Sequence, residues 1–331
     1  MKNKKIFYLL ALSLFLFIVG CSKDDDDPVA PAAPTEFETL ISYIEGSDGG
    51  YMNTSCPAIV TAQSVYESLG SAGTNDYLID IRSATDYSAG HIEGAVNVTL
   101  ANVMTHIKGL TATYDRIILV CYTGQTASFA NALLRLSGYN NVSTMKWGMS
   151  SWHTDFNNKW TTKISDAFAA QFVADTLAKP AAKSYPTIST GKTTGKEILD
   201  ARVAAVLAEG FTCTIDATTL FGSLSSNFIV NYWSKAEYVG MKHIPGAYQY
   251  TPKADLKSTT FLKTLPTDKP VVVYCYTGQT SANLAAILRV LGYNAKTLMF
   301  GANSMINSTM TASKWVATET KNYSYKTGST P

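Results

Sequence analysis

Patterns for metal binding, nucleic-acid binding and membrane spanning are all missing from this 331-residue sequence. Its four histidines are scattered and its five cysteines show no metal-ligand spacing, so we expect neither a metal site nor another cofactor. The net charge is only +2 without a basic stretch, which argues against nucleic acid as a partner. The apolar run from Ile6 to Val19 covers 14 residues, too few to span a bilayer.

That short run has the features of an export signal. It follows a basic start and ends in Ile18-Val19-Gly20-Cys21, which resembles the lipobox of bacterial lipoproteins. The resemblance implies a signal peptide over residues 1–20 and lipid on the sulfur of Cys21, which would attach the chain to a membrane. An ordinary secretory signal is the alternative. Residues 21–35 are acidic and then proline-rich, which predicts an extended tether.

The residues just after Cys21 bear on localisation. Lys23-Asp24-Asp25 is similar to a surface-export signal of some Gram-negative lipoproteins. We therefore expect the protein in the cell envelope, lipid-anchored to a bacterial membrane. The inner membrane and the surface-exposed outer membrane both stay open, and the sequence does not indicate an oligomeric state.

One strand–loop–helix pattern occurs twice, over residues 117–127 and 271–281. Each copy opens with four apolar or β-branched residues, as in a strand buried on both faces, and closes with apolar residues at helical spacing. Gly138 and Gly292 then occupy the usual position after the helix end. Since the copies lie 154 residues apart, a whole domain has been duplicated.

Each copy places a cysteine, Cys121 or Cys275, where the strand ends. Small and polar residues follow, so backbone N–H groups can point at the sulfur, and the helix N-terminus adds partial positive charge. We expect this to favour the thiolate over the thiol, since a drop in pKa from about 8.5 to about 6.5 would leave most of the population ionised at neutral pH. A buried, inert thiol is the alternative, but identity over six residues in both copies argues against it. The predicted anion cradles are Tyr122, Thr123, Gly124, Gln125 and Thr126, and Tyr276, Thr277, Gly278, Gln279 and Thr280.

The chain divides into two predicted domains, residues 36–160 and 196–315. Strands alternate with helices in both, which predicts an α/β fold with a mainly parallel sheet. The connector, residues 161–195, contains a helical pattern over 164–177 and is otherwise rich in Pro, Ser, Thr and Gly. Residues 316–331 form a polar tail that we expect to fray.

The motifs of the first repeat come in a specific order: Asp80-x-Arg82, then Asp86-Tyr87-x-x-Gly90-His91-Ile92-x-Gly94-Ala95, then the Cys121 loop. This order resembles the rhodanese (sulfurtransferase) family. The second repeat matches with drift, because Asn231 and Trp233 replace Asp80 and Arg82. The resemblance implies two tandem rhodanese-like domains, each a parallel five-stranded sheet flanked by helices.

The resemblance also implies a ping-pong sulfurtransferase. Cysteine thiolate takes sulfur from a small anionic donor such as thiosulfate, and the resulting persulfide passes it to a thiol or cyanide acceptor. Cys121 and Cys275 are then the candidate nucleophiles, although neither is followed by the basic residue of the family's usual thiosulfate form. The alternative is a tethered sulfur-carrier or an anion- or partner-binding module with little turnover. A related phosphatase would need an arginine where Ala127 or Ser281 stands.

Two pairs of residues leave alternatives open. The resemblance assigns Asp80 and Arg82 to the wall of the substrate site, but they can equally form an ion pair that only holds the loop. An arginine at the mouth would favour an anionic donor, so we expect Cys121 to be more active than Cys275. Cys56 and Cys213, at similar places in the two repeats, are either buried thiols or a disulfide.

Overall fold

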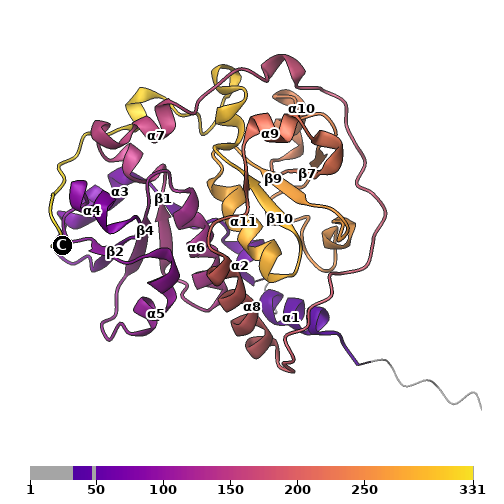
Figure 1. Ribbon diagram of the computed structural model, residues 1–331, viewed down its shortest axis with the longest axis horizontal. Coiled ribbons are helices and arrows are strands. Elements are labelled where there is room, and N and C mark those ends of the chain that lie inside the picture. Colours follow the sequence, from indigo (N-terminus) through magenta and orange to yellow (C-terminus); the bar gives the residue numbers. More distant parts are fainter. Residues whose placement is uncertain (1–32, 47–49, 331) are drawn as a thin grey trace, which may run out of the picture. The chain divides into compact units, whose positions relative to one another are not determined.

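The structure, a computed structural model, describes residues 33–46 and 50–330 and contains two five-stranded sheets (Figure 1). Strand order is β1-β5-β4-β2-β3 in the first sheet and β6-β10-β9-β7-β8 in the second, and every pair is parallel. The predicted tandem α/β fold is therefore confirmed. Repeat 1 contains β1 (Ile59–Val60), α3 (Ala62–Leu69), β2 (Asp76–Asp80), α4 (Ala84–Ala89), β3 (Val96–Asn97), α5 (Val103–Lys108), β4 (Arg116–Val120), α6 (Gln125–Leu136), β5 (Val142–Met145) and α7 (Asn158–Thr161). Repeat 2 contains β6 (Thr214–Ile215), α9 (Ala217–Phe221), β7 (Phe228–Asn231), α10 (Lys235–Gly240), β8 (Tyr248–Gln249), β9 (Val271–Tyr274), α11 (Gln279–Val290) and β10 (Ala295–Leu298).

The two cysteine-bearing strands, β4 and β9, are the middle strands of their sheets. Both consist of buried apolar residues beyond their first position, which explains their continuous apolar sequence. Open parallel sheets bind ligands at the carboxyl ends of their strands. The residue that follows β4 or β9 therefore lies at the edge where a site is expected.

Local signals in the sequence set the ends of the neighbouring helices. The side chain of Ser83 accepts a hydrogen bond from the backbone of Asp86 at the start of α4, and Ser234 forms a full capping box with Glu237 at the start of α10. Gly138 and Gly292 have φ values of 98° and 91°, as expected of a glycine that ends a helix. The predicted positions of these two glycines are confirmed.

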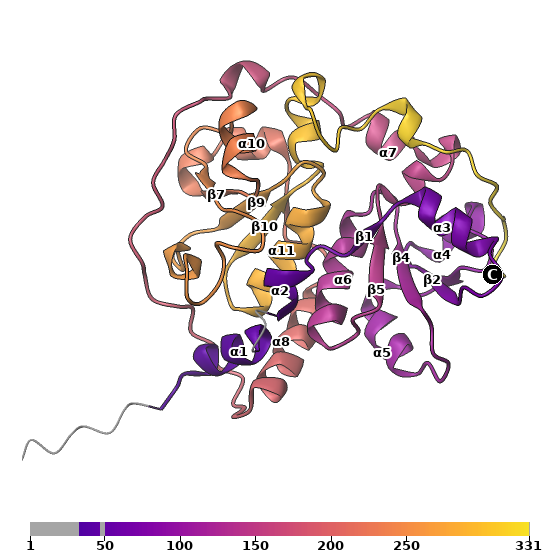
Figure 2. The ribbon, with the colours of Figure 1, turned by 180° about the vertical axis from the view of Figure 1, so that it is seen from behind.

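The helices before each sheet pack together and join the repeats. Helix α1 (Glu36–Glu45) lies against α8 (Gly195–Glu209), as both views show (Figures 1 and 2). Phe37 of α1 stacks on Tyr185 with ring centroids 4.1 Å apart and meets Tyr293 edge-on at 6.3 Å. Helix α1 thus buries its apolar face in a core shared with repeat 2. Helices α6 and α11 also pack on each other, so the sequence boundaries do not divide this core.

The connector departs from the predicted helix over residues 164–177. Only Ala169–Gln171 forms a short 3₁₀ turn, so the helix prediction is wrong. Phe168 instead stacks on Phe221 of repeat 2 at 4.2 Å, and the backbones of Val173 and His243 exchange hydrogen bonds of 2.9 and 3.0 Å. Packing against repeat 2 in an extended conformation overrides the helical spacing of the aromatic residues.

The predicted frayed tail is also corrected by the structure. Up to residue 330, the chain after Trp315 runs along repeat 1 and pairs with it. The N–H groups of Lys321 and Tyr323 donate to the carbonyls of Ser151 and Trp152, both at 2.9 Å. Lys326 and His91 exchange two backbone bonds of 2.9 Å. These contacts satisfy backbone N–H and C=O groups of the tail. Its polar sequence did not predict pairing with repeat 1.

The predicted signal peptide and Cys21 lie outside the described residues, so their interpretation stays an expectation. Among the helices of residues 33–46 and 50–330, none combines the length and apolar character needed to cross a membrane.

Candidate active site

Both cysteines lie buried at the carboxyl end of the central strand, Cys121 with 5% and Cys275 with 3% of its surface exposed. The chain then turns through Gly124 or Gly278, with φ values of 79° and 76°, directly into α6 or α11. Glycine tolerates this left-handed conformation and so permits a helix to begin four residues after the cysteine. The sequence-based placement of both sulfur atoms at a helix N-terminus agrees with this geometry.

Backbone N–H groups point at both sulfur atoms. The Sγ of Cys121 accepts hydrogen bonds from the amides of Gly124 at 3.1 Å and Ala127 at 3.4 Å. The Sγ of Cys275 accepts one from the amide of Ser281 at 3.3 Å, and its thiol lies 3.5 Å from the Ser281 hydroxyl. Each loop therefore holds donors ready for an anionic sulfur.

The surroundings of Cys121 do not make its thiol more acidic. Burial raises its pKa, and the amides of Ala127, Thr123 and Gly124 offset only part of this effect. The expectation of a lowered pKa is therefore wrong for Cys121, because removal of water from the sulfur outweighs the donated hydrogen bonds.

A second turn clamps each cysteine from the side of the adjacent strand. Gly148 and Gly301 follow β5 and β10, and a Cβ on either would lie about 2.2–2.3 Å from the carbonyl oxygen of Cys121 or Cys275. The amide of Met149 donates to the Cys121 carbonyl at 2.8 Å, and its equivalent in repeat 2 does the same. Only glycine fits this approach, so the turn fixes the backbone that carries each sulfur.

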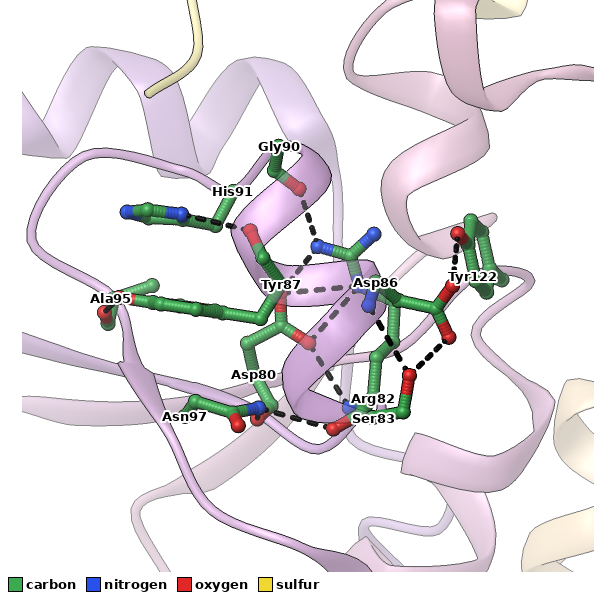
Figure 3. Close-up of polar contacts among 10 residues, drawn as sticks. All are labelled: Asp80, Arg82, Ser83, Asp86, Tyr87, Gly90, His91, Ala95, Asn97 and Tyr122. Carbon is green, nitrogen blue, oxygen red and sulfur yellow. Dashed lines mark hydrogen bonds and ion pairs between the residues drawn. The ribbon is translucent and has the colours of Figure 1, made fainter. Parts of the chain in front are cut away.

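Asp80 and Arg82 form an ion pair inside repeat 1 (Figure 3). The Arg82 guanidinium lies 2.6 Å from the Asp80 carboxylate and donates to the Gly90 carbonyl, also at 2.6 Å. Both side chains are buried, and Arg82 stacks over the ring of Tyr122 at 4.9 Å. Of the two alternatives, the geometry favours a pair that holds the loops. Since Asp80 neutralises Arg82, the charge argument for a more active Cys121 loses its basis.

The tyrosine after each cysteine is anchored to the helix of the preceding motif. The Tyr122 hydroxyl donates to the Asp86 carboxylate at 2.9 Å, and the Tyr276 hydroxyl to Glu237 at 2.8 Å (Figure 3 shows the first pair). Burial, together with the hydrogen bond to Asp86, raises the pKa of Tyr122. Both tyrosines thus remain neutral hydrogen-bond donors that fix the cradle.

Gln125 and Gln279 reach across to the opposite repeat. The Oε1 of Gln125 accepts the N–H of Phe300 at 2.8 Å, and the Oε1 of Gln279 accepts that of Trp147 at 3.0 Å. Phe300 and Trp147 have φ values of 63° and 64°, and each directly precedes the glycine of the clamping turn. Each predicted cradle glutamine therefore supports the turn beside the other cysteine. The repeated loop sequence did not indicate this role.

The threonines and glycines of the loops have mainly local roles. Thr123 Oγ1 accepts from the Gln125 side chain at 3.1 Å, while its carbonyl accepts the indole N–H of Trp160 at 3.2 Å. Thr277 Oγ1 accepts from the Gln279 amide at 3.1 Å. Thr126 and Thr280 lie half-buried in the first turns of α6 and α11.

A cavity of about 380 Å³ opens beside Cys275. Tyr276, Thr277, Gln279 and Thr280 of the second cradle line it, as do Trp233 and Glu237. Repeat 1 contributes Cys56 and Lys146, two residues that the sequence did not assign to this site. Of these two residues only Lys146 has a sequence signal: it directly follows the last residue of β5, at the edge of the sheet where ligand sites form.

The remaining cysteines of the described residues are free thiols. Cys56 donates to the Oδ1 of Asn283 at 2.9 Å, and Cys213 is buried in the same shared core. Burial raises the pKa of Cys56 to about 12, so this thiol stays protonated although it lines the cavity. Of the two alternatives for Cys56 and Cys213, the structure thus has buried thiols.

Comparison with known proteins identifies the repeats. The model of the rhodanese-like domain matches residues 61–155 and 223–305, together more than half of the chain. The chain belongs to the rhodanese-like family. Thiosulfate sulfurtransferase GlpE of Shewanella oneidensis is 35% identical over 77 residues, which are 23% of this chain and 74% of that protein. The corresponding protein of Pseudomonas fluorescens is 34% identical over 80 residues, 24% of this chain and 72% of its own length.

Among solved structures, a thiosulfate sulfurtransferase from Pseudomonas aeruginosa is 18% identical and covers 75% of this chain and 44% of its own, with a TM-score of 0.27. Likeness at that level carries no argument about activity. The rhodanese-like domains and their relatives place the chain in the sulfurtransferase family, as the motifs predicted.

Proposed function

We propose that this protein is a sulfurtransferase that moves sulfane sulfur from an anionic donor to a thiol or cyanide through a persulfide on Cys275. The observation that carries the proposal is the position of the Cys275 sulfur, at the start of α11 and on the wall of a cavity with two lysines, Lys146 and Lys253. Cations that line the cavity attract an anionic donor.

The chain's own groups suit both half-reactions. The Cys275 thiol loses its proton to solvent, and the thiolate attacks the outer sulfur of a donor such as thiosulfate. A new S–S bond forms, the old one breaks, and sulfite leaves with the electron pair. The amide of Ser281, directed at Sγ, stabilises the negative sulfur before and after transfer. Cyanide or a thiolate then removes the outer sulfur and restores the Cys275 thiolate.

We expect Cys275 to turn over faster than Cys121, the reverse of the sequence-based expectation. Full-length Cys275→Ser is expected to lose most thiocyanate formation from thiosulfate and cyanide, and Cys121→Ser to keep most of it. Full activity in Cys275→Ser and none in Cys121→Ser would contradict this assignment.

A sulfur-carrier function with little turnover is the second candidate, and the raised pKa of Cys121 favours it for the first site. A thiol that stays protonated reacts slowly with a donor. Mass spectrometry of the intact protein after incubation with thiosulfate separates the two functions. One added sulfur per chain without catalytic thiocyanate formation would indicate a carrier.

We also propose that the mature chain is lipid-anchored in the bacterial envelope through Cys21. The support is the lipobox-like junction after an apolar core of 14 residues. Several acyl chains on one cysteine would hold the protein to a membrane more firmly than a single chain. Cys21→Ala is expected to abolish both cleavage at this junction and membrane association. A cleaved, membrane-bound Cys21→Ala product would refute lipidation there.

A further inference from the structure

A pair of hydroxyl groups lies behind the Cys275 sulfur. The Ser281 Oγ, in the first turn of α11, lies 3.5 Å from the Cys275 Sγ and 2.7 Å from the Oγ1 of Thr297 on β10. The Thr297 hydroxyl donates in turn to the Gly278 carbonyl at 3.4 Å. Ser281 and Thr297 have no exposed surface. The sulfur therefore stands at the end of a buried chain of two hydroxyls that runs from helix to strand.

This pair suits both protonation states of the cysteine, because either hydroxyl can be the donor in the bond between them. While Cys275 is a thiol, its S–H donates to the Ser281 oxygen. Once the thiol proton has left to solvent, rotation of two O–H bonds lets Ser281 donate to the sulfur and Thr297 donate to Ser281. Thr297 gives up only its long bond to the Gly278 carbonyl. A donor to a buried charged atom is worth more than one between neutral groups.

The first repeat has the same backbone contact without the hydroxyl. Ala127 stands six residues after Cys121, as Ser281 stands six residues after Cys275. The Ala127 amide donates to the Cys121 Sγ at 3.4 Å, close to the 3.3 Å of the Ser281 amide. Burial raises the pKa of Cys121, and backbone amides offset only part of this rise. The two cysteines thus share this amide donor and differ in the side-chain hydroxyl at the sulfur.

The strand member of the pair is present in both repeats. Thr144 is the counterpart of Thr297, because Leu119 and Val273, each two residues before a cysteine, pair with these threonines. Within the part of the chain that the structure describes, the buried Thr144 Oγ1 has no hydrogen-bond partner. A buried hydroxyl in this state is uncommon and costs stability. Only the second repeat therefore has both members of the pair.

We propose that Ser281 is a further catalytic residue of the second site, whose hydroxyl donates to the Cys275 thiolate, and that Thr297 is the positioning residue that orients this hydroxyl. As far as it concerns sulfur transfer, this inference rests on the proposed function of Cys275. The hydroxyl stabilises the negative sulfur before the attack on the donor and again when the acceptor has removed the outer sulfur. A bond that only holds α11 to β10 would leave the reactivity of the sulfur unchanged.

Other titratable groups near Cys275 are common to all the variants compared. Those that line the cavity with it are Cys56, Lys146, Glu237, Lys253 and Tyr276. Burial raises the pKa of Cys56 to about 12 and also raises that of Tyr276. Since none of these residues is substituted, a difference between variants reports the hydroxyl.

The test measures how alkylation of Cys275 by iodoacetamide depends on pH, with peptide mass spectrometry of the full-length protein. Ser281→Ala copies Ala127 and removes one donor from the thiolate. The midpoint of the pH profile should therefore rise by about one pH unit. Thr297→Val breaks the same bond between α11 and β10 but leaves the Ser281 hydroxyl beside the sulfur. Its shift should be less than about half as large.

The reverse change applies the same test to repeat 1. Ala127→Ser gives Cys121 a hydroxyl and Thr144 a partner, so the midpoint for Cys121 should fall by about one pH unit. Ser128→Ala is the matched control, because Ser128 is equally buried on α6 and its Oγ has no partner among the described residues. It should leave both midpoints unchanged.

Sulfur transfer gives a second readout. In full-length Cys121→Ser, adding Ser281→Ala should slow thiocyanate formation from thiosulfate and cyanide about threefold below the midpoint. A tenfold loss of thiolate is partly offset by the greater nucleophilicity of a more basic thiolate. A rate that Ser281→Ala leaves unchanged would overturn its catalytic role.

The alkylation arm is decisive without sulfur transfer. Equal midpoint shifts in Ser281→Ala and Thr297→Val would overturn the proposal, because the bond between helix and strand would then explain both. An unchanged midpoint in Ser281→Ala would overturn it as well. If Cys121→Ser formed no thiocyanate while the alkylation shifts appeared as expected, the proposed function would fail and the bond from Ser281 to the thiolate would stand.

Discussion

Gln125 is expected to support the cysteine of the opposite repeat, and Gln125→Ala tests this. The Gln125 Oε1 accepts the N–H of Phe300, and the turn that follows holds the Cys275 carbonyl through the amide of Ala302 at 2.9 Å. Loss of the acceptor leaves the half-buried N–H of Phe300 without this partner, at a cost of about 1–3 kcal/mol. Loss of one buried methylene adds about 0.8 kcal/mol. We expect a total loss of about 2–4 kcal/mol in unfolding free energy.

Urea unfolding measures this loss as a lower midpoint with an unchanged slope. Gln63→Ala is the matched control, because Gln63 is exposed and bonds only to Glu67 of its own helix, at 2.8 Å. It should cost less than about 0.5 kcal/mol. Gln279→Ala should cost somewhat less than Gln125→Ala, since the Gln279 Nε2 has no partner to lose while that of Gln125 bonds Thr123.

Alkylation of individual cysteines tests whether Gln125 supports the cysteine of the opposite repeat. If about 1–2 kcal/mol of the loss appears as easier local opening, Cys275 should react about five- to thirtyfold faster with iodoacetamide in Gln125→Ala. Peptide mass spectrometry resolves Cys275 from Cys121. Faster alkylation of Cys121 alone would refute the reasoning, because Gln125 would then serve only its own loop.

Two further predictions follow from buried groups. Arg82→Ala should lower the unfolding free energy by about 3–5 kcal/mol in urea, because it leaves the buried Asp80 carboxylate without its partner. The double change Asp80→Asn with Arg82→Trp copies Asn231 and Trp233 of repeat 2 and should cost less. An equal cost would contradict the ion-pair argument. Burial raises the pKa of Cys213 from 9.0 to about 11, so the folded state holds this proton more tightly. Stability should therefore be full below about pH 9 and fall as the pH rises toward about 11, and Cys213→Ala should reduce that fall.

The sequence was sufficient for the parts of the site that depend on local order. An apolar run, a cysteine, a glycine and a helical pattern placed both sulfur atoms at the end of a buried strand, where the structure has them. The helix ends at Gly138 and Gly292 were equally visible in the sequence, because a glycine that ends a helix is a local signal. Such features depend on short spacings that a single sequence displays directly.

What the sequence could not predict depends on contacts between distant segments. Gln125 and Phe300 are 175 residues apart, and nothing in a loop motif tells whether a glutamine faces a substrate or another domain. The helical spacing over 164–177 was real, yet Phe168 and Phe172 are buried against repeat 2 without a helix. The raised pKa of Cys121 could not be predicted either. Burial and hydrogen bonding shift this pKa in opposite directions, and only the structure shows which effect is larger.

The difference between the two sites follows from how the repeats meet. Each repeat supports the turn beside the other cysteine through a glutamine, and repeat 1 also lines the cavity beside Cys275. Lys146 belongs to repeat 1 and yet lines the cavity beside Cys275, whereas its counterpart Met299 brings no charge to the first site. The two cradles therefore keep the same sequence over six residues while the residues around them differ between the repeats.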